Sequence, residues 1–238
     1  MKTDSDNTAL IYIHGAGLGS YMWDRVMGKT KLPAVAINFP CRDTKDATHL
    51  EFNDYINEIV AQIKTTKYDS YILVGHSIGG IVGLGVAEKL KDSVKGYVII
   101  GSSVPKVEGS FASAVPGIGR YILTLGIRLF GTRPPKAAIK AGLSNDVSDA
   151  DKEMVANRYV NESKELYFGR VKNVTGNFPT LYIRTLKDKE YALMLQDETI
   201  ENIPNCQVAT IDCGHMPMLT NPDELIAILD RFLPSKIS

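Results

Sequence analysis

The stretch that decides the fold is Leu73-Val74-Gly75-His76-Ser77-Ile78-Gly79-Gly80. It places the pattern Gly-x-Ser-x-Gly between an apolar run at 71–74, which predicts a strand, and small apolar residues at 81–90, which predict a helix. In such a strand–turn–helix the serine occupies a tight, strained turn that projects its hydroxyl out of the sheet. Gly75 and Gly79 have no side chain, so the strand and the helix can approach closely around this turn. Because the context meets each requirement, we predict that Ser77 is a nucleophile rather than part of an ordinary glycine-rich turn.

A second glycine-rich loop follows the first apolar run of the chain, at 9–13, and reads His14-Gly15-Ala16-Gly17-Leu18-Gly19. We expect it to aim the backbone N–H of Ala16 at an oxyanion, together with the N–H of Ile78 at the start of the helix after Ser77. A dinucleotide-binding loop is the alternative. Its spacing is Gly-x-Gly-x-x-Gly, whereas these glycines are evenly spaced, and no acidic residue ends the next apolar run, at 34–38. We expect His14 to be a structural, hydrogen-bonded residue.

The general base is sought among four histidines: His14, His49, His76 and His215. His215 follows the last predicted strand, at 207–211. A loop in that position lies at the carboxyl edge of a parallel sheet, near the serine turn. We therefore predict that His215 takes the proton of Ser77 and later returns it to the leaving group.

The acid that orients this base is expected between the serine and the histidine in the chain. The loop after the predicted strand at 180–183 holds Asp188, our choice, and Glu190, the fallback. Another position for the acid, after the predicted strand at 97–100, reads Gly101-Ser102-Ser103 and has no carboxylate. The predicted catalytic residues are therefore Ser77, Asp188 and His215, in this order.

Fully apolar runs alternate with helical patterns, which indicates a parallel sheet covered on both faces. The six runs are 9–13, 34–38, 71–74, 97–100, 180–183 and 207–211. We predict a single three-layer α/β domain over residues 1–238, with its core at 8–103 and 179–238. Residues 104–178 would form an inserted helical cap, with helices at 118–130 and 149–171.

These motifs resemble those of the α/β-hydrolase superfamily, which has the order Ser, Asp, His. More narrowly, the chain resembles the branch that holds plant methyl esterases, hydroxynitrile lyases and their bacterial esterase relatives. The likeness rests on the spacing of His14 and Trp23, on Leu195-Gln196 after the acid loop, and on Gly214-His215-Met216-Pro217-Met218-Leu219 followed by Asn221-Pro222. It implies an α/β-hydrolase fold with a mostly parallel sheet, and oxyanion donors at the N–H groups of Ala16 and Ile78.

The chain also departs from this branch. Its hydroxynitrile lyases carry a lysine directly after the catalytic histidine, where this chain has Met216. The loop after the second predicted strand, Asn38-Phe39-Pro40-Cys41-Arg42, differs from the usual pattern as well. A serine nucleophile suits acyl transfer. We therefore predict a serine carboxylesterase that cleaves a small carboxylic ester, with a hydroxynitrile lyase or a non-catalytic ligand receptor on the same fold as alternatives.

The helix predicted at 118–130 has its apolar residues on one side. We favour a helix that covers an apolar pocket over a plain packing helix. A membrane-surface helix is ranked last, because within it only Arg120 and Arg128 are basic. Candidate residues for the pocket wall are Phe111, Tyr121 and Phe130, with Tyr159, Tyr167 and Phe168 as further aromatic candidates.

Composition excludes several other classes. The 27 Lys and Arg balance the 27 Asp and Glu, which argues against nucleic acid as a partner. No apolar run approaches the roughly 20 residues of a membrane span, and the polar start is unlike a secretory signal. Three cysteines without a Cys-x-x-Cys pattern suggest a cytoplasmic protein. We expect no metal and no cofactor, and a small-molecule ester as the substrate. The oligomeric state is left open, with a homodimer as one alternative.

Overall fold

The computed structural model of the chain describes residues 7–115, 117–143 and 145–233. Within them, six parallel strands form one sheet in the order β2-β1-β3-β4-β7-β8. The strands are β1 (Thr8–Ile13), β2 (Ala34–Ile37), β3 (Ser70–His76), β4 (Val94–Ile100), β7 (Thr180–Thr185) and β8 (Gln207–Ile211). The prediction of a parallel sheet built from these six apolar runs is confirmed.

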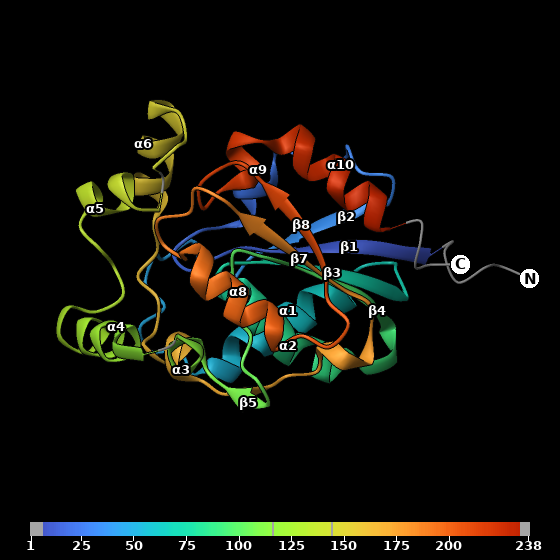
Figure 1. The fold of residues 1–238 in the computed structure, drawn as a ribbon, viewed down its shortest axis with the longest axis horizontal. Helices are drawn as coiled ribbons and strands as arrows, with labels where there is room; N and C mark the ends of the chain where they lie inside the picture. The colour runs from blue at the N-terminus through green and yellow to red at the C-terminus, as the bar shows by residue number, and fades with distance from the viewer. Residues whose placement is uncertain (1–6, 116, 144, 234–238) are drawn as a thin grey trace, which may run out of the picture.

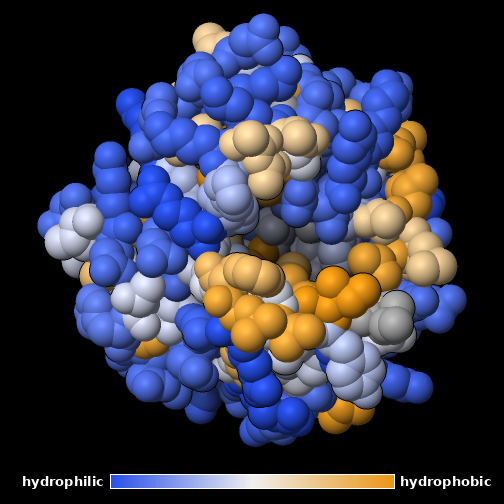
Figure 2. Space-filling view, turned by 90° about the vertical axis from the view of Figure 1, so that its left-hand side faces the viewer, coloured by the Kyte–Doolittle hydropathy of each residue, from blue (hydrophilic) through white to orange (hydrophobic). Residues whose placement is uncertain are grey.

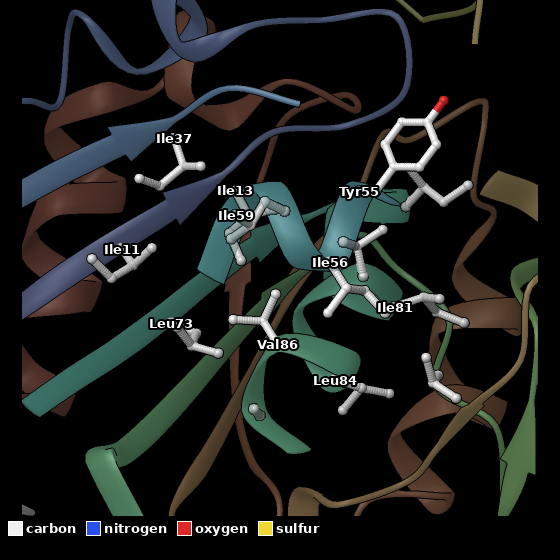
Figure 3. Close-up of a cluster of buried hydrophobic side chains, with 14 of the residues drawn as sticks. Ile11, Ile13, Ile37, Tyr55, Ile56, Ile59, Leu73, Ile81, Leu84 and Val86 are labelled. Atoms are coloured by element: carbon white, nitrogen blue, oxygen red, sulfur yellow. The ribbon is translucent and has the colours of Figure 1, made fainter. Parts of the chain in front are cut away.

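Both faces of the sheet are covered because successive side chains of a strand point to opposite sides. Ile11 and Ile13 of β1 belong to one buried cluster, whereas Leu10 and Tyr12 belong to the other. Figure 3 shows the first cluster, in which isoleucines of β1 meet side chains of the helices that cover this face. These helices are α1 (Phe52–Lys64), α2 (Ile78–Leu90) and, nearby, α8 (Leu193–Glu201). The other face is covered by α9 (Pro217–Thr220) and α10 (Pro222–Phe232) (Figure 1). Met22 and Trp23 of η2 (Ser20–Trp23) belong to the buried cluster on this face. A short helix, η3 (Lys91–Ser93), joins α2 to β4.

Residues 104–178 connect β4 to β7, and those of them that the structure describes contribute no strand to the main sheet. Their elements are β5 (Glu108–Gly109), α3 (Phe111–Ala114), α4 (Gly117–Phe130), α5 (Lys136–Ala141), α6 (Asp149–Arg158), α7 (Glu165–Phe168), β6 (Val171–Lys172) and η4 (Thr175–Asn177). Figure 1 shows α4, α5 and α6 beyond the carboxyl ends of the strands. The division of the chain into a core and a cap stays a prediction.

The prediction of a long helix in this segment, at 149–171, is wrong. The helix expected at 149–171 ends with α6 at Arg158, and the chain then runs extended to α7. The physical reason is that its backbone groups bond to loops of the sheet instead of to one another. The N–H of Val160 donates to Gly17 O at 2.9 Å, and the carbonyl of Asn161 accepts from the N–H of Ala47 at 2.8 Å. The stretch 159–164 thus lies against the loop that follows β1.

In the part of the chain that the structure describes, no helix has both the length and the apolar character needed to cross a membrane.

Candidate active site

Ser77 occupies the sharp turn between β3 and α2. Its φ of 54° and ψ of −133° lie in a region that residues other than glycine rarely adopt. The turn is held by β4, because the N–H of Ser77 donates to Ile100 O at 2.9 Å. Gly79 is required for the close approach of α2, since a Cβ there would lie 2.5 Å from His14 O. The predicted strand–turn–helix around Ser77 is therefore present.

The loop after β1 lies directly against this turn. A Cβ at Gly15 would lie 3.0 Å from the Cβ of Ser77, so only glycine fits there without displacement. Ala16 and Ile78, whose N–H groups are the predicted oxyanion donors, line the same cavity as Ser77. Ile78 is also the first residue of α2, where the partial positive charge of a helix N-terminus favours an anion. The two predicted donors thus flank Ser77.

His215 and Asp188 form a buried pair. The Nδ1 of His215 lies 2.7 Å from Asp188 Oδ2, and the two side chains are only 3% and 0% exposed. Asp188 Oδ2 also accepts from the Thr185 hydroxyl at 2.8 Å. Its Oδ1 accepts from the N–H groups of Glu190 and Tyr191, both at 2.9 Å. Four donors therefore fix the carboxylate, and the carboxylate orients the imidazole so that Nε2 is left for other chemistry.

The pair shifts the pKa of each partner in favour of the charged forms. Burial alone would lower the pKa of His215, but the charge of Asp188 and its hydrogen bond outweigh burial and raise it above 6.5. Burial would raise the pKa of Asp188, and the charge and hydrogen bond of His215 outweigh it and lower that pKa. Asp188 is therefore ionised at neutral pH.

Ser77 and His215 open onto a common cavity of about 900 Å³ at the carboxyl ends of the strands. In the described residues, no hydrogen bond joins the Ser77 hydroxyl to the His215 ring. Such bonds are often long in the absence of substrate and tighten in the complex. The geometry therefore brings Ser77 and His215, the predicted nucleophile and base, to one cavity.

Apolar and aromatic side chains make up most of the cavity wall. Of the predicted wall residues, Phe111, Phe130, Tyr159 and Tyr167 are present, whereas Tyr121 and Phe168 are not. Tyr121 is 64% exposed, because α4 turns it to the outside, where it contacts the Arg120 side chain. Residues of α4 that the sequence did not single out complete the wall: Gly119, Leu123, Gly126 and Ile127. Only the apolar periodicity of 118–130 pointed to this helix.

The likeness to known proteins agrees with this geometry. Residues 10–228 match the Alpha/beta hydrolase family. The chain belongs to the alpha/beta hydrolase family. This hydrolase is 24% identical to Methylesterase 17 of Arabidopsis thaliana over 92% of its own length and 89% of the relative's. It is 23% identical to the carbendazim hydrolyzing esterase of Nocardioides sp. strain SG-4G, over 90% and 95% of the two chains. The predicted resemblance to the methyl esterase branch is thereby confirmed.

Solved structures share the fold of the hydrolase. An extracellular alpha/beta-hydrolase from a Paenibacillus species superposes with a TM-score of 0.80 at 16% identity, over 94% of this chain and 98% of that one. A pyrethroid hydrolase from Sphingobium faniae JZ-2 gives a TM-score of 0.77 at 19% identity, over 96% and 98%. The α/β-hydrolase fold predicted from the sequence is confirmed.

His76 contributes to the site of the hydrolase in a way that sequence reasoning missed. Its Nε2 donates to the carbonyl of His215 at 2.7 Å, and the two rings lie 4.7 Å apart. Burial, followed by the charge of His215, lowers the pKa of His76 to about 3. A neutral His76 therefore anchors the backbone of His215 without competing for its proton. The sequence placed His76 beside Ser77 but carried no signal for a partner 139 residues away.

Glu162 is a second residue that the sequence did not indicate. It is fully buried and reaches the loop after β1, where its Oε1 accepts from the N–H of Gly17 at 2.8 Å. Its carboxylate also pairs with Arg42 at 2.7 Å and accepts from the Tyr55 hydroxyl at 3.0 Å. Burial raises the pKa of Glu162, and the charge of Arg42 opposes this. Glu162 thus ties residues 159–164 to the loop that holds Ala16.

The two remaining histidines, His14 and His49, lie in different surroundings. His14 is buried and makes two hydrogen bonds, with Nδ1 to Gly15 O at 2.8 Å and with Nε2 from the N–H of Phe39 at 3.1 Å. His14 therefore supports the loop after β1, whereas His49 lies in a surface segment before α1.

Among the described residues, no group of three or more His, Cys, Asp or Glu side chains is arranged to hold a metal ion.

Proposed function

We propose that this hydrolase is a serine esterase that acts through an acyl-enzyme. The observation that carries the proposal is the convergence on one cavity of the strained Ser77 turn and the buried pair of His215 and Asp188. Two curated relatives named as esterases, the methylesterase and the carbendazim hydrolyzing esterase, support ester hydrolysis as the reaction.

In the proposed mechanism, Ser77 Oγ attacks the ester carbonyl carbon while His215 Nε2 takes its proton. The N–H groups of Ala16 and Ile78 bind the oxyanion that forms. Collapse of this intermediate expels the alcohol, which takes the proton from His215 and leaves an acyl group on Ser77. Water then attacks the acyl-enzyme with His215 again as the base, and the carboxylic acid is released.

The cavity supports a bulkier substrate than the small ester expected from the sequence. Its volume of about 900 Å³ lies near the top of the range for ligand pockets, roughly 300–1,000 Å³. Leu18, Phe111 and Leu195 are among the apolar residues that line the cavity with Ser77. We therefore propose an uncharged ester with a sizeable apolar acyl or alcohol group. Met216, where the lyases carry lysine, is fully buried and does not line the cavity, which supports hydrolysis over lyase chemistry.

The experiment that tests the function combines labelling with an ester series. A fluorophosphonate is expected to label the wild-type protein on the peptide that contains Ser77, and p-nitrophenyl esters are expected to be hydrolysed faster as the acyl chain lengthens to fill the cavity. A protein that is neither labelled nor active on any ester would contradict the proposal. Release of cyanide from mandelonitrile without ester hydrolysis would favour the lyase, and ligand binding without turnover would favour the receptor.

We expect Glu162 to act as a positioning residue for the oxyanion loop. Glu162→Ala removes the acceptor of the Gly17 N–H, so the neighbouring Ala16 N–H loses its fixed direction. One oxyanion donor contributes roughly 100- to 1,000-fold to kcat, so a misdirected donor is expected to cost at least about tenfold. Glu162→Gln keeps an oxygen for Gly17 and is the matched variant, expected to retain more of kcat than alanine. The measurement is kcat and KM at a temperature where both variants are folded. A purely structural role would lower the melting temperature of Glu162→Ala and leave kcat unchanged.

A further inference from the structure

Helix α4 exposes an unusual amount of apolar surface. Five of its side chains, each between 58% and 84% exposed, form what we term the α4 face: Tyr121, Ile122, Leu125, Leu129 and Phe130. Among the α4 side chains that the structure describes, Ile127 is the buried one. Exposed apolar residues gathered in one place mark interaction sites on soluble proteins more often than single exposed residues do. The α4 face is therefore a candidate contact surface.

The α4 face is continuous with the mouth of the cavity. Ile122 and Phe130 belong to both the exposed face and the cavity wall. Figure 2, which views the molecule from the side where α4 lies, shows a hollow near the centre with hydrophobic surface along its lower rim. Any partner that covers this face therefore also lies at the entrance to the Ser77 site.

The charged residues in the stretch of chain that contains α4 are all basic. The sequence from 109 to 145 contains Arg120, Arg128, Arg133, Lys136 and Lys140 but no Asp or Glu, although the whole chain is neutral. Lys140 pairs with Glu153 from α6. Within the described part of the chain, no ion pair compensates the exposed arginines at 120, 128 and 133. Arg133 itself lines the cavity, where Glu190 is the acidic residue of the described wall.

We propose that the α4 face docks on an anionic lipid surface. Apolar side chains flanked by arginines are the pattern of helices that lie in the plane of a membrane interface, where the apolar groups enter the headgroup region and basic groups meet lipid anions. A second copy of the chain fits less well, because two such faces would bring their uncompensated arginines together. The sequence alone placed this interpretation last, since α4 has only two basic residues. The structure adds Arg133 in the cavity wall and exposes the apolar side chains.

Docking in this position would deliver apolar esters from the lipid phase directly to the cavity. This consequence rests on the proposed function, whereas the docking itself rests only on the α4 face and its charge. The two are separated by the Ser77→Ala variant, which is expected to bind lipid as the wild type does. Binding measurements therefore test the docking even if the proposed reaction is wrong.

The test is co-sedimentation of the full chain with phosphatidylcholine vesicles that contain or lack about one third phosphatidylglycerol. We expect binding to the anionic vesicles, weakened by salt, and little binding to the neutral ones. The double variant Leu125→Ser/Leu129→Ser is expected to bind at least about tenfold more weakly, because it removes two exposed leucines that docking would bury in the lipid. Neither residue lines the cavity, so hydrolysis of a water-soluble ester by this variant should match the wild type.

Two further variants keep the test specific. Val208→Ser removes an exposed apolar side chain from β8, on the edge of the sheet, and is expected to bind vesicles as the wild type does. Arg120→Gln/Arg128→Gln is expected to lose the preference for anionic vesicles. Equal binding to both vesicle types, or unchanged binding by the leucine double variant, would overturn the proposal. So would a wild-type dimer that this double variant converts to a monomer, because the α4 face would then be a contact between two copies.

Discussion

Ser77→Ala is expected to lower kcat for ester hydrolysis by about a million-fold, the loss seen when a nucleophilic serine is removed from a working triad. No other described side chain at the turn can replace it, because Ile78 on one side is apolar and His76 on the other is committed to the carbonyl of His215. Residual activity would come only from the oxyanion donors and from substrate binding. Steady-state hydrolysis of a p-nitrophenyl ester measures this loss, and fluorophosphonate labelling should disappear with it.

The fold should survive this substitution. Alanine keeps the Cβ of serine, so the left-handed backbone at position 77 is no more strained than before. The melting temperature is therefore expected to stay close to that of the wild type. Ser102→Ala is the matched control, since Ser102 is also buried near the start of α2 and its hydroxyl donates to a backbone carbonyl, that of Ser103. Labelling of Ser77→Ala at the wild-type rate, or loss of labelling in Ser102→Ala alone, would contradict the assignment of Ser77.

Much of the fold could be predicted because it is encoded in local patterns. Runs such as Ala9-Leu10-Ile11-Tyr12-Ile13 are apolar on both faces, and this is the pattern of a parallel strand between two helical layers. The prediction of one helix over 149–171 was wrong because contacts distant in the sequence decide the structure there. Its helical pattern is real only as far as Arg158, after which hydrogen bonds to Gly17 and Ala47 override local propensity. Such distant partners leave no periodic trace in the sequence.

The candidate site also combines residues that local patterns predict with residues that only distant contacts bring into place. Asp188 and His215 could be paired in advance because both follow strands that end at one edge of the sheet, and the structure places them 2.7 Å apart. Their catalytic roles stay predictions. Glu162 could not be found, because its bond to Gly17 joins residues 145 positions apart. Tyr121 was misplaced because helical spacing groups residues on one face without saying whether that face points inward or outward.

The pH dependence of kcat/KM should follow the pKa of His215. The proposed base must be neutral to take the proton of Ser77, so activity is expected to rise as the pH increases through the pKa of His215. Asp188 raises that pKa above 6.5, so the midpoint of the rise should lie above pH 6.5. Rates measured from acidic to mildly alkaline pH, with stability checked at each pH, would show it. A midpoint well below pH 6.5 would mean that Asp188 does not raise the pKa of His215.

Asp188→Asn is expected to lower kcat by about 10,000-fold, because an amide in this place favours the wrong tautomer of His215 and no longer stabilises the imidazolium. Its residual activity should also titrate differently. Without the carboxylate, burial becomes the dominant influence on His215 and lowers its pKa, so the midpoint of the pH profile should move below 6.5. Glu190→Gln is the matched control, since Glu190 is the other carboxylate of this loop and lines the cavity. It is expected to keep most of kcat and to lower the midpoint less than Asp188→Asn does, because the charge of Glu190 raises the pKa of His215 less than that of Asp188. If instead Glu190→Gln were the variant that lost activity and shifted the midpoint, Glu190 would be the residue that orients His215.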